Sequence, residues 1–147
     1  MNLKRHPQHT LVLIALLLLG GGCSVAIRDA AFSDDEEWAS ILADKICGLQ
    51  SESRSQNGSR YATLKELAPV IGVDPKLIVA SPGGAETVIA RGYLVRMYVD
   101  KAKYNVHVQP VEFGQSRRVS FYCDNTGPVR FSDSSKPAGP NYGSVFR

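Results

Sequence analysis

The chain has 147 residues, 44% hydrophobic and 21% charged, a balance typical of one globular domain that excludes a disordered or fibrous chain. Its 17 Lys+Arg stand against 14 Asp+Glu, but Lys4 and Arg5 lie in a segment that we expect to be removed, which leaves 15 basic against 14 acidic residues. This excess is too small for a general nucleic-acid binder, whose affinity depends on a dense field of Lys and Arg facing phosphates.

The first 22 residues have the three parts of a secretory signal peptide. A positive start is followed by an apolar run from Leu11 to Leu19 and by three glycines before Cys23. The apolar run is much shorter than the roughly 20 residues that a helix needs to cross a bilayer. We therefore expect residues 1–22 to be cleaved and not to remain as a membrane-spanning helix.

Small residues followed at once by cysteine resemble the bacterial lipobox, in which the cysteine thiol receives a diacylglycerol and becomes the first residue of the mature chain. The resemblance implies that Cys23 is lipidated, that residues 23–32 form a tether, and that the protein is anchored in the cell envelope, facing the periplasm or the cell surface. Ser24 takes the place of an Asp that would retain the protein in the inner membrane, so we expect the outer membrane. The alternative is ordinary cleavage near Gly22, which would leave Cys23 as a free thiol.

Lipidation of Cys23 leaves an even pair of cysteines, Cys47 and Cys123, in a compartment that favours disulfides. We predict a disulfide between them, which would stabilise the fold by about 4.5 kcal/mol on the chain-entropy model because the two positions lie 76 residues apart. The alternative is two buried free thiols that pack as small apolar side chains. A CxxC motif is absent, and His107 alone supplies too few ligands for a metal site, so we predict neither a cofactor nor a metal.

A capping box of Ser33 and Glu36 predicts that a helix begins after Ser33, and the polar stretch after residue 51 predicts that it ends at about Ser53. Its apolar positions recur at steps of three and four residues, the period of an amphipathic helix. The residues on this face are Trp38, Ile41, Leu42, Ile46 and Leu49, with the charged Lys45 among them. We expect this apolar stripe to cover a sheet.

Two shorter helical segments are predicted next in the chain. A second capping box, Thr63 with Glu66, indicates a helix through about Val70. Asp74-Pro75 indicates a single helical turn to about residue 79, because aspartate caps a helix and proline suits its first position.

Hydrophobicity alternates with period two in the second half of the chain, which predicts half-buried strands. We expect strands over residues 92–99, 104–109, 118–123 and 129–131, joined by short turns into an antiparallel meander. The predicted fold is therefore α+β: an N-terminal helix packed on a three- to four-stranded antiparallel meander, with short helices between them, over residues 33–131. Residues 132–147 are rich in Ser, Pro and Gly, and we expect them to be extended or disordered.

A helix laid across an antiparallel meander is the layout of type IV pilin-like and pseudopilin-like head domains, and several short blocks of this chain are similar to blocks of such a domain. They are residues 61–67, Gly92-Tyr93, Pro110, Phe113-Gly114, residues 120–124, Gly127 and Val129-Arg130. The resemblance covers about residues 27–131. Pilins assemble through a long apolar N-terminal helix, which this chain replaces with a lipoprotein signal. The resemblance therefore implies a pilin-like head on a lipid anchor, without assembly into a pilus shaft.

The sequence has no pattern that predicts catalysis. His107, the only histidine outside the signal segment, occupies a polar strand position without a nucleophile motif nearby. The acidic run of residues 34–37 suits a helix N-terminus better than a metal site, and Gly83-Gly84 lacks the motif of a nucleotide-binding loop. We therefore predict that the protein is not an enzyme.

Charge is distributed unevenly along the mature chain. Residues 23–80 contain 6 Lys+Arg and 9 Asp+Glu, whereas residues 81–147 contain 9 and 5. The predicted partner-binding residues lie on the outward face of the meander by the strand alternation, and Arg and Tyr are enriched at interface centres. These residues are Arg96, Tyr98, His107, Arg118 and Tyr122. The alternative is a solvated face with no specific site.

Two functions follow from these predictions. The first is a lipid-anchored, non-enzymatic envelope protein that acts in protein interaction or in envelope- or secretion-associated assembly. The second is a lipid-tethered periplasmic module that binds an anionic ligand or polymer through the basic sheet face. Both functions involve the membrane through the N-terminal lipid, and neither involves nucleic acid or a metal.

Overall fold

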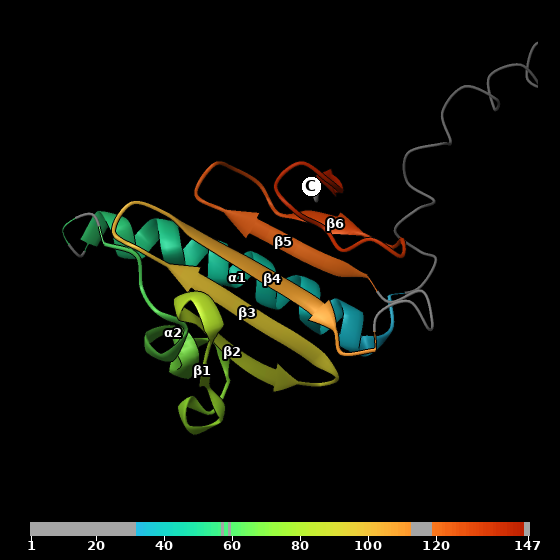
Figure 1. Cartoon of the computed structure of the whole chain (residues 1–147), viewed down its shortest axis with the longest axis horizontal. Coiled ribbons are helices and arrows are strands. Elements are labelled where there is room, and N and C mark those ends of the chain that lie inside the picture. The colour runs from blue at the N-terminus through green and yellow to red at the C-terminus, as the bar shows by residue number, and fades with distance from the viewer. Residues whose placement is uncertain (1–31, 57, 59, 113–118, 146–147) are drawn as a thin grey trace, which may run out of the picture. The chain divides into compact units, whose positions relative to one another are not determined.

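The computed structural model describes residues 32–56, 58, 60–112 and 119–145 (Figure 1). Residues 33–147 form one of two compact units of the chain. The predicted signal peptide, Cys23, nearly all of the tether and Arg118 lie outside the described residues. Among the helices of the described residues, none combines the length and the hydrophobicity that crossing a bilayer requires.

The long helix α1 (Asp34–Gln56) begins at the predicted capping box. The Glu36 carboxylate accepts a hydrogen bond from the Ser33 N–H at 2.8 Å, and the Ser33 hydroxyl accepts one from the Glu36 N–H at 3.4 Å, which confirms this prediction. Ile41, which we placed in the apolar stripe, is 57% exposed. The buried core side chains of α1 are Ala39, Leu42, Ala43 and Ile46.

Two shorter helices follow, α2 (Leu64–Ile71) and the 3-10 turn η1 (Pro75–Leu77). The Thr63 hydroxyl accepts a hydrogen bond from the Glu66 N–H at 3.2 Å, and the Glu66 carboxylate accepts one from the Thr63 N–H at 2.7 Å. The second predicted capping box is therefore confirmed. The predicted cap of η1 is also confirmed, because the carboxylate of residue 74 accepts a hydrogen bond from the backbone N–H two residues later at 2.9 Å.

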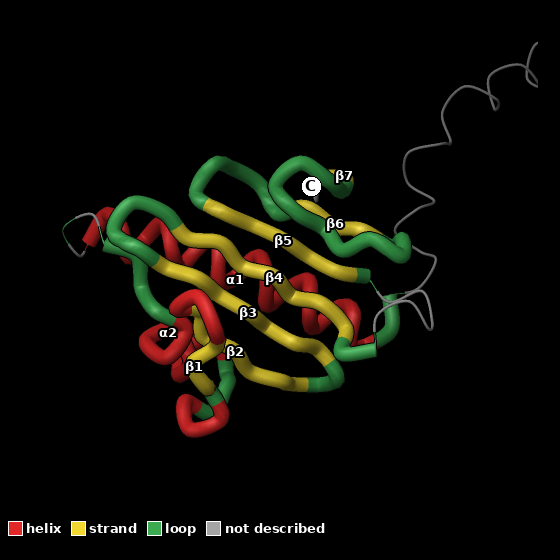
Figure 2. The backbone as a smooth tube through the Cα atoms, in the orientation of Figure 1, coloured by secondary structure: helices red, strands yellow, loops and turns green. Residues whose placement is uncertain are grey.

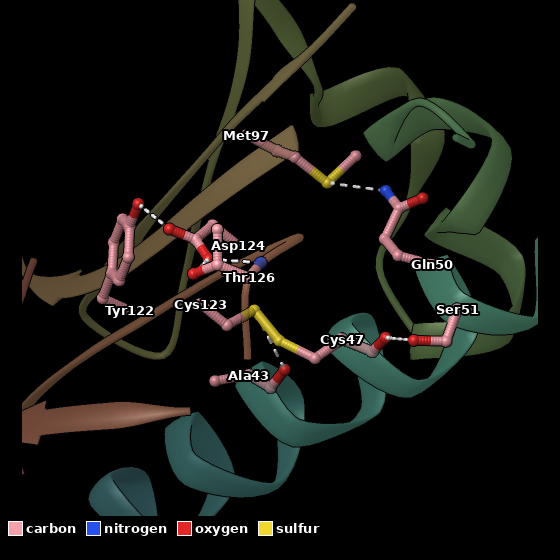
Figure 3. The surroundings of a disulfide bond; sticks show 9 residues. All are labelled: Ala43, Cys47, Gln50, Ser51, Met97, Tyr122, Cys123, Asp124 and Thr126. Atoms are coloured by element: carbon pink, nitrogen blue, oxygen red, sulfur yellow. Dashed lines mark hydrogen bonds between the residues drawn. A yellow bond between two sulfur atoms is a disulfide. The ribbon is translucent and has the colours of Figure 1, made fainter. Parts of the chain in front are cut away.

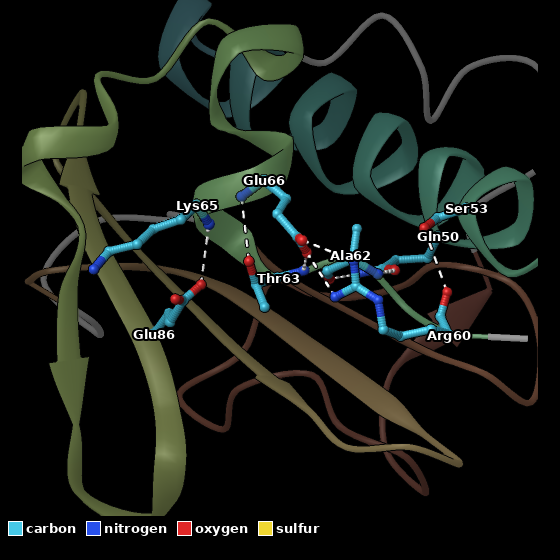
Figure 4. Close-up of polar contacts among 8 residues, drawn as sticks. All are labelled: Gln50, Ser53, Arg60, Ala62, Thr63, Lys65, Glu66 and Glu86. Atoms are coloured by element: carbon cyan, nitrogen blue, oxygen red, sulfur yellow. Dashed lines mark hydrogen bonds and ion pairs between the residues drawn. The ribbon is translucent and has the colours of Figure 1, made fainter. Parts of the chain in front are cut away.

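The Gln50 side chain joins α1 to the segment that leads into α2 (Figure 4). Its amide group donates a hydrogen bond to the Ala62 carbonyl at 2.7 Å and accepts one from the Ala62 N–H at 2.9 Å. Both residues are buried. The side chain thus satisfies two backbone groups of a connecting segment that is shielded from water.

Within the described residues, seven strands form one antiparallel sheet in which each strand pairs with the next along the chain (Figure 2). They are β1 (Val79–Ser81), β2 (Ala85–Ala90), β3 (Tyr93–Val99), β4 (Tyr104–Pro110), β5 (Ser120–Asp124), β6 (Arg130–Ser132) and β7 (Ser144–Val145). The expected three- to four-stranded meander is therefore wrong. The sheet also contains β1, β2 and β7, and the 3-10 turn η2 (Pro82–Gly84) joins β1 to β2.

The additional strands lack the alternating pattern by which a strand is predicted from sequence. β1 and β7 have only three and two residues, too few to show a period of two. In β2 the inward-facing positions include Glu86, which is paired with Met97, so a carboxylate interrupts the apolar pattern. This carboxylate accepts a hydrogen bond from the Lys65 N–H in the first turn of α2 at 3.0 Å, which compensates for its inward position.

The two faces of the sheet differ. The inner face packs on α1, which lies across β4 and β5 (Figure 1). Among the buried side chains of this face are Tyr93, Val95, Met97, Val106, Val108, Phe121 and Cys123. The outer face carries the alternate residues of the same strands, because successive strand residues point to opposite sides.

The chain between β6 and β7, residues 133–143, folds back onto the outer face; we call it the C-terminal segment. The Ala138 N–H donates a hydrogen bond to the Ser120 hydroxyl at 2.9 Å, and Ala138 is 2% exposed. The Ser132 hydroxyl donates to the Lys136 carbonyl at 2.7 Å and closes a turn. This part of the chain, which we expected to be extended or disordered, thus satisfies backbone groups with serine side chains.

Candidate functional site

The strand register brings four side chains into one row on the outer face. Arg96 of β3 is paired with His107 of β4. His107 is paired with Tyr122 of β5, which is paired in turn with Arg130 of β6. Directly paired residues of antiparallel strands project to the same side of a sheet. Three of the predicted partner-binding residues, Arg96, His107 and Tyr122, are therefore neighbours.

A pocket of about 430 Å³ opens between this row and the C-terminal segment. One side is formed by the outer face of β3 and β4, and the other by residues 136–139. The lining residues are Arg96, Asn105, His107, Gln109, Lys136, Pro137, Ala138 and Gly139. None of these side chains is acidic, and every polar side chain among them can donate a hydrogen bond. The pocket is therefore chemically suited to an anion.

His107 is half-buried in this pocket, and its ring centroid lies 4.8 Å from that of Tyr122 in an edge arrangement. Burial lowers the pKa of the imidazole below its usual value, and the nearby Arg96 guanidinium lowers it further. The empty pocket therefore favours the neutral form of the imidazole. An anion in the pocket would offset both effects and favour the protonated ring.

Tyr122 and Tyr98 have different surroundings. Tyr122 is 6% exposed, and its hydroxyl donates a hydrogen bond to the Asp124 carboxylate at 2.8 Å. Burial and this hydrogen bond raise the pKa of the Tyr122 hydroxyl. Its ring therefore supports His107, while its hydroxyl is already engaged. Tyr98 is half-buried opposite Asn105 on the same face.

Lys136 is a charged pocket residue that the sequence analysis did not predict. Its carbonyl is fixed by the Ser132 hydroxyl, and its ammonium lies 4.4 Å from the ring centroid of Tyr142 in a cation–π contact. The Tyr142 hydroxyl is also hydrogen-bonded to the Ser134 hydroxyl at 2.8 Å. The serines at positions 132 and 134 are a local signal of this turn, because serine side chains frequently close such turns.

A disulfide joins Cys47 of α1 to Cys123 of β5, with their Cα atoms 6.5 Å apart (Figure 3). Cys123 is buried, whereas Cys47 is only partly buried. Since α1 lies on the inner face of the sheet, this bond fixes the helix to the strand next to β4. The disulfide has a structural role and lies on the inner face of the sheet. The 430 Å³ pocket lined by Arg96, His107 and Lys136, which we call the basic pocket, lies on the opposite face.

A second pocket, of about 510 Å³, lies between α1 and the turn that follows β5. Its lining includes Cys47, Arg54, Asp44 and Asp124, so that both signs of charge are present. The Arg54 guanidinium is hydrogen-bonded to the hydroxyl of Tyr61 at 2.7 Å. This mixed lining gives no preference for the charge of a ligand, in contrast to the basic pocket on the outer face.

Within the described ranges, no group of three or more His, Cys, Asp or Glu side chains could hold a metal ion. Comparison with protein-family models, with curated proteins and with solved structures gives no match for this chain. The similarity to pilin-like head domains and the lipoprotein signal therefore stay predictions.

Proposed function

We propose that this protein is a lipid-anchored component of the bacterial cell envelope that acts by binding an acidic protein partner, without catalysis. In this proposal Cys23 carries the lipid, and the folded domain presents the outer face of its sheet. The supporting observation is the basic pocket on that face, which Arg96, His107 and Lys136 line together and whose described lining residues include no acidic side chain. Positive charge concentrated in a concave site favours an anionic partner.

Exposed apolar side chains on the same face favour a protein over a highly charged polymer. Val79 and Ile89 are 58% and 60% exposed. The pairing of Val79 with Thr87, and of Ile89 with Leu94, places them on the outer side of β1 and β2. Protein interfaces combine apolar contacts with arginine and tyrosine, whereas binding to a polyanion depends mainly on Lys and Arg charges.

A second candidate function is a lipid-tethered module for an anionic polymer or small molecule. The pocket itself favours this function, because its volume of about 430 Å³ lies within the range of small-ligand sites. The two functions differ in what the apolar residues of β1 and β2 do. A protein partner would cover them, whereas a small anion would leave them exposed to water.

Cross-linking in the native cells tests the proposed function. A photoreactive amino acid at Leu94, on the outer face, should cross-link to a partner, whereas one at Ile41, exposed on α1, should not. The Arg96→Glu and Lys136→Glu double variant should lose the cross-link at Leu94, because an acidic partner would be repelled.

Lys101→Glu with Lys103→Glu is the matched control, since it changes the net charge equally at two exposed residues outside the pocket. This control should keep the cross-link. Cross-links that form only from Ile41 would exclude the outer face as the binding surface. A Leu94 cross-link that survives the Arg96 and Lys136 reversal unchanged would exclude these two charges as the groups that attract the partner.

A further inference from the structure

The geometry points to a specific role for the basic pocket: it receives one carboxylate side chain of an acidic peptide segment, held by Arg96 and His107 from the sheet and by Lys136 from the C-terminal segment. This inference rests on the proposed function and names the chemical group that the outer face recognises. It concerns the pocket alone, and the apolar residues of β1 and β2 lie outside it.

The three groups come from three different elements. Arg96 and His107 are directly paired across β3 and β4, and Lys136 belongs to the C-terminal segment on the other side of the pocket. Within the described part of the chain, neither Arg96 nor Lys136 forms an ion pair with a carboxylate. An entering carboxylate therefore supplies the counter-charge that these two cations lack, and the planar guanidinium fork of arginine matches a carboxylate in two-point geometry.

Two further hydrogen-bond donors in the pocket come from the neighbours of His107 in β4. Asn105 and Gln109 flank it on the same face of β4, and both line the pocket. A pocket of about 430 Å³ has room for a whole acidic residue, since it lies within the range of sites that enclose small ligands.

The backbone of the C-terminal segment favours a carboxylate over a phosphate. Phosphate sites are commonly built from several free backbone N–H groups that point at the anion. Here the Ala138 N–H donates to the Ser120 hydroxyl, and the Gly139 N–H donates to the Tyr142 carbonyl at 2.9 Å. Pro137 has no N–H. The donors that remain are side chains, which suit the two oxygens of a carboxylate.

Binding at this site is coupled to the protonation of His107. The charged and titratable groups around the imidazole are Arg96 from β3, Tyr122 with its bonded Asp124 from β5, and Lys136 across the pocket. Burial and Arg96 disfavour the protonated ring when the pocket is empty. A bound carboxylate favours it, so affinity should increase as the pH falls.

Nuclear magnetic resonance of the His107 ring in the full chain, purified in detergent, tests this inference. The probes are a hexaglutamate peptide, a hexaglutamine peptide and inorganic phosphate at constant ionic strength, and His107→Gln identifies the resonance. Hexaglutamate should raise the titration midpoint of His107 by about half a pH unit, and its dissociation constant should be about threefold lower at acidic than at alkaline pH. Hexaglutamine should leave the midpoint unchanged.

The Arg96→Gln and Lys136→Gln double variant should lose the hexaglutamate effect, whereas Lys101→Gln should keep it. An unchanged midpoint with hexaglutamate, or an equal change with hexaglutamine, would overturn the inference. A larger change with phosphate than with hexaglutamate would assign the pocket to a phosphate-bearing ligand and would also overturn it. A cross-link from Leu94 tests whether a partner covers the outer face, so it can form even if the pocket binds no carboxylate. Failure of the proposed function and failure of this inference are therefore distinguishable.

Discussion

Gln50 is a residue whose hydrogen bonds an apolar side chain cannot replace. Its amide group serves both the N–H and the carbonyl of Ala62, and it also donates to the Met97 sulfur at 3.4 Å. We expect Gln50→Leu to lower the free energy of unfolding by about 2–3 kcal/mol, because two buried backbone groups would lose their partner. Urea denaturation monitored by circular dichroism measures this loss.

Gln56→Leu is the matched control, since Gln56 lies in the same helix and is exposed. The control should change the free energy of unfolding by no more than about 0.5 kcal/mol. Equal effects of the two substitutions would show that the Gln50 hydrogen bonds do not stabilise the fold.

Glu66 should make the stability of the domain depend on pH in the acidic range. A hydrogen bond from Arg60 and one from the Thr63 N–H lower the pKa of Glu66 to about 2. Because this pKa lies below that of the unfolded chain, the stabilisation is fully present above about pH 4.5 and is lost as the pH falls towards 2. The side chain is 44% exposed, so we expect only about 1 kcal/mol.

The measurement is the free energy of unfolding of the native chain and of Glu66→Gln at neutral pH and at pH 3. The difference between the two proteins should be present at neutral pH and much reduced at pH 3. Arg60→Gln separates the ion pair from the cap, because it keeps the Thr63 hydrogen bonds. A difference that does not change with pH would contradict the assignment to the ionised carboxylate.

Residues that act on near neighbours in the chain could be predicted, and those that act on distant segments could not. The caps at Ser33 and Thr63 are fixed by a glutamate three residues later, so the sequence alone predicts them. Gln50 acts on a segment 12 residues away, and Lys136 and Arg96 line one pocket only because the sheet and the C-terminal segment pack together. Such contacts are set by tertiary structure, which a local pattern does not contain.

At the level of elements, the C-terminal segment depends on one glycine. Gly143 has a φ of 112°, and a Cβ atom there would lie 2.6 Å from the Phe131 carbonyl oxygen. We expect Gly143→Ala to detach the segment from the sheet, because the substituted residue meets both strain and a backbone clash. Hydrogen exchange at the Ala138 amide, which is bonded to Ser120, should become faster by about tenfold or more.

Gly139→Ala is the matched control, since a Cβ atom at Gly139 would meet no atom within 4 Å. It should leave the exchange rate of the Ala138 amide unchanged. If Gly143→Ala also leaves this rate unchanged, the C-terminal segment does not need the Gly143 conformation to pack on the sheet.

The longer strands that could be predicted share a clean alternation of apolar and polar residues. In β3 and β4 the inward residues are all apolar, and both strands are seven residues long. β2 has Glu86 at an inward position, which the first turn of α2 compensates. β1 and β7 receive their strand conformation from pairing with β2 and β6, so their own sequences carry almost no signal.

At the scale of the whole molecule, the disulfide links the helical layer to the sheet. Breaking it should lower the free energy of unfolding by about 4.5 kcal/mol on the chain-entropy model, because its two cysteines are 76 residues apart. The measurement is urea denaturation with and without reductant. The Cys47→Ala and Cys123→Ala double variant should be equally destabilised and insensitive to reductant, and a reductant effect in this variant would exclude the disulfide as its cause.

The basic pocket is also a property of the whole molecule. The alternation of β3 and β4 was enough to place Arg96 and His107 on one face, and their pairing makes them neighbours. The wall that turns this face into a pocket comes from residues 136–139, beyond the last strand that the sequence predicted. A basic face could therefore be predicted from the sequence, but its concave shape could not.

The proposed lipid anchor and the proposed acidic partner both depend on export to the cell envelope, a compartment that also favours the disulfide. The measurement that tests this export most directly is the intact mass of the protein purified from membranes, with thiols alkylated before and after reduction. We predict the mass of residues 23–147 with a diacylglycerol on Cys23, and two further thiols that react only after reduction. An unlipidated chain with three freely reacting thiols would contradict both the anchor and the disulfide.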